Sequence, residues 1–184
     1  MGGRGIAKVP LLEYNEDLVI ESEEVTKCIA NNLEGDALVC SGAEEACLER
    51  FLQIWYPVVD TYYSVLTATS ESSVRGSLQR FKVALSSLES VLQESKSDEF
   101  VLDSFSVAEC IAAPWVQRFF VTLPFYRNII ADELLAERTE RWMKAVRNRP
   151  SVMASKCPED EMLAAAERYY VSYVTPGAPC RSLS

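Results

Sequence analysis

The chain has 184 residues, 48% of them hydrophobic and 24% charged, which is the composition of an ordinary globular protein. Its 18 Lys and Arg against 27 Asp and Glu give a formal net charge of -9, and this charge repels nucleic-acid phosphates and anionic membrane surfaces. No apolar run reaches the roughly 18 residues needed to span a bilayer. We therefore expect no nucleic-acid partner and no membrane partner.

Histidine is absent, which excludes His-containing zinc sites and every Ser-His or Cys-His catalytic arrangement. The six cysteines are irregularly spaced and never form C-x-x-C: Cys28, Cys40, Cys47, Cys110, Cys157 and Cys180. This usage indicates free thiols in a reducing compartment. We predict no metal site and a cytoplasmic location, with an organellar location left open because a longer product would carry its own targeting segment.

The first part of the chain predicts a β-hairpin followed by a helix. Residues 9–14 and 18–20 are typical of strands, and the turn-forming residues 15–17 lie between them. Residues 22–33 follow with helical spacing of apolar positions. Gly35 and Gly42 then bracket a loop. We expect one domain over residues 1–36, a second over 43–174 and an irregular tail over 175–184.

From residue 43 onward the apolar pattern is helical throughout. A first long helix is expected to reach about residue 68, with Pro57 kinking it or marking a local break. A second helix carries one apolar stripe from Val74 to Leu92, so the two pack as an antiparallel pair. Further helices are expected over about 132–146 and 161–173. The contact face of the last one comprises Met162, Leu163, Ala166, Tyr169 and Tyr170.

Between these helices, Ser106 and Glu109 form a predicted capping box. The Ser106 hydroxyl can accept from the backbone N–H of Glu109, and the Glu109 carboxylate can reach back to the Ser106 N–H. The helix that begins here, over about 106–121, is apolar on all sides, which is typical of a buried helix. We expect it to form the centre of the helical domain.

The order of these motifs resembles the glutathione transferase family. K-V-P-x-L at 8–12 and I-E-S at 20–22 resemble the second half of its thioredoxin-like domain. F-S-V-A-E at 105–109 and W-x-x-x-V-x-x-R-P-S at 142–151 resemble its helical domain. V-P-L-L-E-Y, N-N-L-E-G and A-P-W-V-Q-R-F are most similar to the lambda and omega classes. The resemblance implies a mainly α fold, a helical bundle preceded by a partial thioredoxin-like hairpin and helix.

The resemblance also implies a site for glutathione. The Val9-Pro10 bond would be cis, and the Val9 backbone would pair with the cysteinyl part of the tripeptide. The helix N-terminus at Ser22 suits the γ-glutamyl carboxylate, and Glu21 would take the γ-glutamyl ammonium. Lys8 would bind the glycyl carboxylate or is simply a solvated lysine.

A second-substrate pocket is expected between the first long helix and the buried helix. Candidates for its wall are Trp55, Tyr62, Trp115 and Arg118. Core packing is the alternative for each aromatic residue, and a structural ion pair is the alternative for Arg118.

No residue matches the family's catalytic position, which in the omega and lambda classes is a Cys at the start of an earlier helix. We assign the catalytic role to no residue. The sheet would also be incomplete, because two strands alone leave an exposed edge and an uncovered apolar face. Three interpretations stay open. The chain is an inactive part of a Cys-type thiol transferase or reductase, which would use glutathione and a small electrophile or disulfide. It is a non-catalytic binding or protein-assembly module. Or a partner, in a homodimer or another complex, supplies the missing strands.

Overall fold

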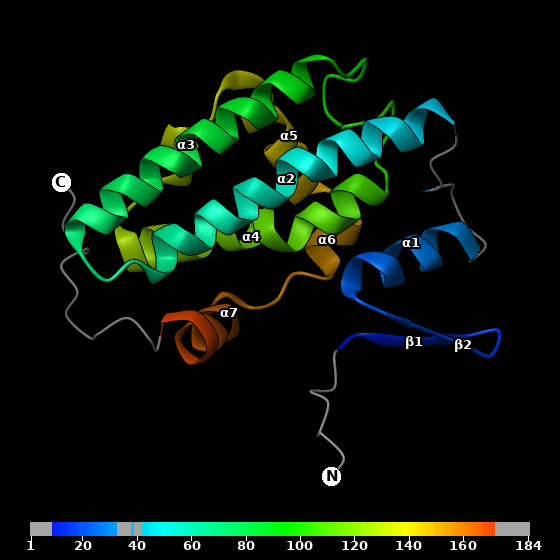
Figure 1. Ribbon diagram of the computed structural model, residues 1–184, viewed down its shortest axis with the longest axis horizontal. Helices are drawn as coiled ribbons and strands as arrows, with labels where there is room; N and C mark the ends of the chain where they lie inside the picture. Colours follow the sequence, from blue (N-terminus) through cyan, green and yellow to red (C-terminus); the bar gives the residue numbers. More distant parts are fainter. Residues whose placement is uncertain (1–8, 33–37, 39–41, 172–184) are drawn as a thin grey trace, which may run out of the picture.

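The computed structural model describes residues 9–32, 38 and 42–171, with side chains to residue 169. Strands β1 (Leu11–Tyr14) and β2 (Asp17–Ile20) come first. The helices are α1 (Ser22–Asn32), α2 (Ala43–Thr67), α3 (Glu71–Gln93), α4 (Val107–Arg127), α5 (Glu137–Asn148), α6 (Pro150–Ala154) and α7 (Glu159–Ala166). A 3₁₀ turn, η1 (Ala131–Leu134), precedes α5, and a π-helical turn, η2 (Glu167–Val171), follows α7. The prediction of a mainly helical fold preceded by a hairpin and one helix is confirmed (Figure 1).

The hairpin is closed by a two-residue turn. Asn15 and Glu16 both have positive φ, 50° and 70°, which is the backbone of a type I′ turn. The strands pair with Leu11 opposite Ile20 and Tyr14 opposite Asp17. In the described part of the chain the sheet has these two strands alone.

One face of this hairpin is uncovered. Leu11, Leu18 and Ile20 are 55%, 64% and 46% exposed, while Leu12 and Val19, which alternate with them, are half-buried. Helix α1 packs on the hairpin and also on α4. The predicted exposed apolar face is therefore present in the structure.

Helices α2 and α3 lie side by side and antiparallel, with α4 beneath them (Figure 1). Their interior is aromatic: the Trp55 ring lies 5.5 Å from Trp142, 5.8 Å from Phe51 and 5.9 Å from Phe119. Pro57 is exposed on α2, and the helix continues through it, so the predicted alternative of a break is wrong. The missing N–H falls on the solvent side, where water can satisfy the carbonyl that loses its partner.

Helix α4 is longer than predicted and reaches Arg127 instead of about residue 121. The buried Arg127 guanidinium donates to the carbonyls of Leu66 and Ala68, the latter at 2.8 Å. These two carbonyls lie at the end of α2, where the last carbonyls of a helix have no N–H donor within the helix. The last turn of α4 is thus held by a contact with a distant segment, which local sequence does not reveal.

The C-terminal helices differ from prediction at three places. The helix expected from residue 132 begins at Glu137, after the separate turn η1. Pro150 does end α5, but it also begins a short helix, α6, because proline suits the first helical position. In the last helix Met162 and Ala166 are buried as expected, whereas Tyr169 is 58% exposed. The side chain of Tyr170 and the tail 175–184 lie outside the described residues.

Candidate functional site

The start of the hairpin brings Val9 toward the start of α1. The Val9-Pro10 peptide bond is cis, as the family resemblance implies. Val9 precedes β1, lies outside the strand ladder and is 86% exposed. The strand ladder ends with Leu11 opposite Ile20, two residues after Val9 and two residues before Ser22, so Val9 and Ser22 lie at the same end of the hairpin. Figure 1 shows the beginning of β1 beside the first turn of α1.

Glu21 directly precedes α1 and has an uncommon backbone conformation. Its φ is 73°, in the left-handed region that residues other than glycine seldom adopt, and such residues cluster at functional sites. Its carbonyl accepts from the Val25 N–H at 2.9 Å, so the helix starts directly after it. The first N–H groups of a helix have no acceptor within the helix, and they carry a partial positive charge. The start of α1, with Ser22 exposed, is therefore suited to an anionic group.

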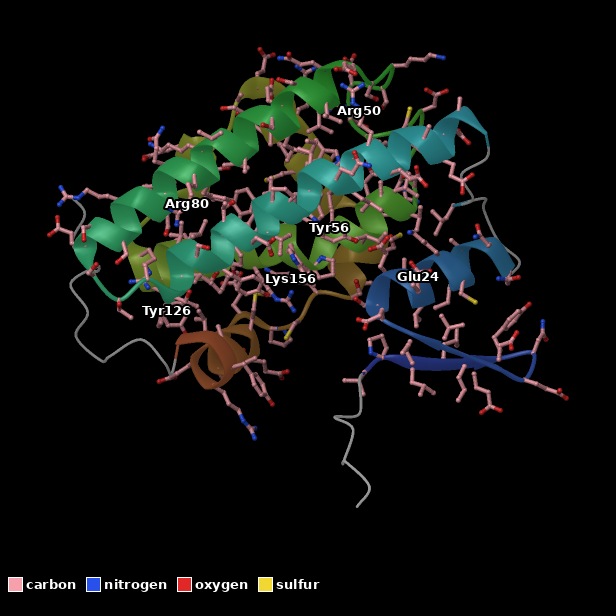
Figure 2. The ribbon with its side chains drawn as sticks, viewed as in Figure 1. Glu24, Arg50, Tyr56, Arg80, Tyr126 and Lys156 are labelled. Atoms are coloured by element: carbon pink, nitrogen blue, oxygen red, sulfur yellow. The ribbon has the colours of Figure 1, made fainter. Side chains whose placement is uncertain are left out.

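Helix α1 is tied to the bundle through Glu23. The Tyr56 hydroxyl of α2 donates to the Glu23 carboxylate, which also pairs with Lys27 at 2.5 Å. The hydrogen bond with Glu23 raises the pKa of Lys27 above its ordinary value. Tyr56 and Glu24 are labelled in Figure 2, which shows α2 passing above α1. The Glu23 contacts thus fix the first turn of α1 on the bundle. This turn, with Glu21 and Ser22, and the adjoining hairpin end, with Val9 and Pro10, form one corner of the molecule. Lys8 lies outside the described residues.

A second feature is a cavity of about 650 Å³ in the helical bundle. Its lining comes from α2, α4, α6, α7 and the segments beside them: Tyr62, Phe105, Cys110, Ala113, Pro114, Gln117, Arg118, Thr122, Ser151, Val152, Ser155, Cys157, Met162, Ala165, Ala166 and Tyr169. Of the four residues that the sequence suggested for a second-substrate pocket, Tyr62 and Arg118 line it. Trp55 is packed in the aromatic core and 1% exposed, and Trp115 is not part of the lining.

Hydrogen bonds across the helices hold the walls of this cavity. The Gln117 amide donates to the Val152 carbonyl at 3.2 Å, which joins α4 to α6. The Tyr126 hydroxyl donates to the Leu163 carbonyl at 2.9 Å, which joins α4 to α7; Tyr126 is labelled in Figure 2. Burial raises the pKa of Tyr126, so this phenol keeps its proton. Hydrogen bonds therefore fix α6 and α7 against α4 around the cavity.

Tyr62 contributes its aromatic ring to the cavity wall, and its hydroxyl is not available as a hydrogen-bond donor to a ligand. The Thr122 hydroxyl donates to the Arg118 carbonyl at 2.8 Å, which uses its single proton. The bond of 2.7 Å between the Tyr62 and Thr122 hydroxyls must then be donated by Tyr62. The Tyr62 proton is thereby directed at Thr122.

The predicted capping box is present at the start of α4. The Ser106 hydroxyl accepts from the Ala108 N–H at 3.2 Å and donates to Glu109 at 2.8 Å, while the Ser106 N–H donates to Glu109 at 2.9 Å. Glu109, which is fully buried, also accepts from the Val101 N–H at 2.7 Å and from the Trp142 indole at 3.1 Å. These last two contacts were not visible from the sequence, because they join residues far from the motif.

Four cysteines lie among the described residues, and all are free: Cys28, Cys47, Cys110 and Cys157. Cys110 and Cys157 line the cavity, a placement that sequence reasoning missed. Burial, with a smaller effect of Glu109, raises the pKa of the Cys110 thiol, which makes it a poor nucleophile. Within the described ranges, no group of three or more Cys, Asp or Glu side chains could hold a metal ion, and none of those helices is long and apolar enough to cross a bilayer.

No protein-family model matches the chain. Over 122 residues it is 28% identical to "Glutathione S-transferase L2, chloroplastic" of Arabidopsis thaliana, an alignment covering 66% of this chain and 40% of that protein. Over 125 residues it is 26% identical to "Protein IN2-1 homolog B" of Oryza sativa subsp. indica, covering 66% of this chain and 48% of that protein. The chain thus spans less than half the length of these curated relatives.

The fold matches a solved structure, the crystal structure of glutathione transferase Omega 3C from Trametes versicolor. The TM-score is 0.67 at 19% identity, and the match covers 82% of this chain and 67% of that one. The structural likeness shows a shared fold, and the Arabidopsis relative carries the name of the same family. By sequence and fold together, this chain is a relative of the glutathione S-transferase family.

Proposed function

We propose that this chain binds glutathione at the start of α1 and a second substrate in the cavity of the helical bundle. The observation that carries the proposal is the corner formed by Val9 and the first turn of α1, where backbone donors, a partial positive charge and an exposed backbone edge converge. Glutathione offers a matching set of groups. Its γ-glutamyl carboxylate would bind the N–H groups and hydroxyl at Ser22, and its ammonium would pair with Glu21.

The remaining contacts follow from the strand geometry. Val9 precedes the ladder and has no partner in it. We expect its backbone amide and carbonyl to pair with the extended cysteinyl backbone, as an added strand would. Lys8 would bind the glycyl carboxylate. On this proposal, residues 1–36 form the glutathione-binding part and residues 43–174 the helical domain.

The chemistry we propose is that of a Cys-type thiol transferase or reductase. A cysteine thiolate would attack the glutathione sulfur of a mixed disulfide and release the substrate thiolate. A second glutathione thiolate would then attack the glutathione sulfur of this enzyme–glutathione disulfide, which forms glutathione disulfide and releases the cysteine as its thiolate. Because Cys110 has a raised pKa and Cys28 lies inside α1, we assign this cysteine to neither of them.

The binding proposal can be tested by retention on immobilised glutathione. We expect the wild-type chain to be retained and eluted by free glutathione. Ser22→Ala removes a hydrogen bond to a charged group, so the affinity should fall by about tenfold or more. Ser86→Ala is the matched control, since Ser86 is an exposed helical serine on α3. If the wild type passes through unretained, this chain has no glutathione site.

A non-catalytic binding or assembly module is the second candidate. The positions of the cysteines favour it. None of the described cysteines lies in the first turn of a helix that faces Val9 and the start of α1, where a catalytic thiolate would be expected. The two candidates separate on activity. A module would bind glutathione or a partner and show no thiol-transfer activity, even when expressed with any upstream coding sequence.

A further inference from the structure

A surface pocket of about 480 Å³ lies beside α5, and it shares no lining residue with the cavity of the helical bundle. Arg141, Lys144 and Asn148 of α5 line it, at spacings of three and four residues that place them on one face of the helix. Arg149, which follows the helix, lines it as well. Its described lining thus has three cations and one carboxylate, that of Glu99, in a chain of net charge -9. We call it the basic pocket.

Arg149 is held in place by aromatic rings. Its guanidinium lies over the Phe105 ring, 4.0 Å from the ring centre, and Phe100 meets the same ring edge-on at 5.8 Å. The Arg149 Nε is buried and has no hydrogen-bond partner. Stacking uses the flat face of the guanidinium and leaves the terminal nitrogens available. Within the described part of the chain these nitrogens make no ion pair, so Arg149 is a fixed and unpaired cation.

The two cations on α5 are also open to a ligand. Lys144 is exposed and makes no ion pair with any residue that the structure describes, although Glu140 lies one turn before it. Arg141 pairs with Glu137 at 2.9 Å and with Asp98 at 3.5 Å, but those two acidic side chains are 89% and 90% exposed. Ion pairs so open to water contribute little, so a bound anion can compete with them.

These donors suit an anion with several oxygens and more than one charge. A guanidinium presents paired N–H groups that match a phosphate, and an ammonium adds a point charge beside it. The Asn148 side-chain amide can donate as well. Phe100 and Pro150 add apolar surface next to the cations. A volume of about 480 Å³ lies in the range of pockets that take a small organic molecule.

From these observations we infer that the basic pocket binds small organic phosphate monoesters, with the phosphate between Lys144 and Arg149 and the organic part against Phe100 and Pro150. This inference goes beyond the proposed function and does not depend on it, because neither the start of α1 nor the cavity contributes to this pocket. Charge is the expected basis of selection. A phosphate monoester carries about -1.5 to -2 at pH 7, whereas a sulfate monoester of similar shape carries a single negative charge.

Phenyl phosphate and phenyl sulfate form a matched pair of probes for isothermal titration calorimetry of the full chain near neutral pH. We expect the wild type to bind phenyl phosphate at least about fivefold more tightly than phenyl sulfate, because more of the charge is matched. Inorganic phosphate should bind more weakly than phenyl phosphate, because it lacks the ring that packs against Phe100 and Pro150.

Variants of Lys144 locate the site. Lys144→Gln should weaken phenyl phosphate by about fivefold, and Lys144→Arg, which keeps the charge, should stay within about twofold of the wild type. Lys82→Gln is the matched control, since Lys82 is an exposed lysine of α3 outside the pocket, and it should leave the affinity unchanged. Arg149→Gln should weaken phenyl phosphate by about tenfold, with circular dichroism to check that the variant is folded.

Several results would overturn the inference. They are a lack of saturable binding of phenyl phosphate, equal affinity for phenyl phosphate and phenyl sulfate, and an equal loss in Lys144→Gln and Lys82→Gln. Inorganic phosphate that binds as tightly as phenyl phosphate would overturn the assigned ligand class, because the organic part would not be recognised. Failure of glutathione retention, with the calorimetry as expected, would overturn only the proposed function.

Discussion

The indole Nε1 of Trp142 donates to Oε1 of Glu109 at 3.1 Å, and this bond joins α5 to the capping box of α4. Both side chains are fully buried. Glu109 accepts from two backbone N–H groups and the Ser106 hydroxyl as well, so one carboxylate joins α4, α5 and the segment before α4. Because α4 supplies much of the cavity wall, this network positions the cavity.

Glu109→Gln should lower the free energy of unfolding by about 3 kcal/mol, because the new amide NH₂ faces donors that then lack an acceptor. Urea denaturation followed by circular dichroism measures this change. Glu133→Gln, an exposed residue of η1, is the control and should change the free energy by less than about 0.5 kcal/mol. A Glu109→Gln variant as stable as the control would contradict the role given to this network.

Ser106→Ala should cost about 2 kcal/mol, and Ser70→Ala about 1 kcal/mol. Both serines begin helices and both accept from a backbone N–H at 3.2 Å. Ser106 is buried and also donates to Glu109, whereas Ser70 is exposed. Thermal and urea unfolding of the two variants would show the difference, and equal costs would mean that burial of the cap contributes nothing.

Glu89 provides a prediction about pH. Helix α5 has no side-chain cap of its own at Ala136. Instead, the Glu89 carboxylate of α3 accepts from the Thr139 hydroxyl and N–H at 2.7 Å and from the Arg138 N–H at 3.2 Å. Burial raises the pKa of Glu89, but these bonds, with one from Gln93, together outweigh burial and hold the pKa below its ordinary value.

A lowered pKa means that the folded state favours the ionised carboxylate. The stabilisation is therefore complete above the unfolded value of 4.5 and is lost as the pH falls through the folded pKa. Glu89→Gln should cost about 1 kcal/mol at pH 7, and its deficit relative to wild type should shrink as the pH falls below 4.5. A deficit that stays constant across this range would show that the charge of Glu89 does not matter.

The uncovered face of the hairpin predicts self-association. Leu18→Lys should reduce association, measured by light scattering over a concentration series, because it places a charge on an exposed apolar strand. Val83→Lys on α3, where Val83 is 58% exposed, is the matched control. If both variants associate as the wild type does, this face is not the surface responsible.

Local sequence was enough to predict the capping box, the apolar stripes of α2 and α3 and the turn of the hairpin. Each depends on residues within a few positions of one another, as Ser106 and Glu109 do. Contacts between distant segments were not predictable. Glu89 caps a helix that begins 48 residues later, at Glu137, and Arg127 satisfies carbonyls at the end of α2.

The candidate site divides in the same way. Val9, Glu21 and Ser22 were suggested by the family's short motifs; their places at the start of the hairpin and of α1 follow from local structure, and their role in binding stays a prediction. Tyr62 and Arg118 line the cavity, but Cys110 and Cys157 were missed, because α4 and the segment before α7 approach each other only in the folded chain. Trp55, which was predicted to line the pocket, is packed in the core instead. The spacing of apolar residues along a helix is the same for a core residue and for a pocket residue, so the sequence did not distinguish them.

The most direct test of the proposed site is a ¹⁵N–¹H titration of the chain with reduced glutathione, with the isomeric tripeptide that has an ordinary α-glutamyl linkage as the control. The account predicts that the backbone amides of Ser22, Glu23 and Val9 shift on adding glutathione and shift far less with the isomer. Unchanged amides at the start of α1, or equal shifts with the two tripeptides, would contradict it.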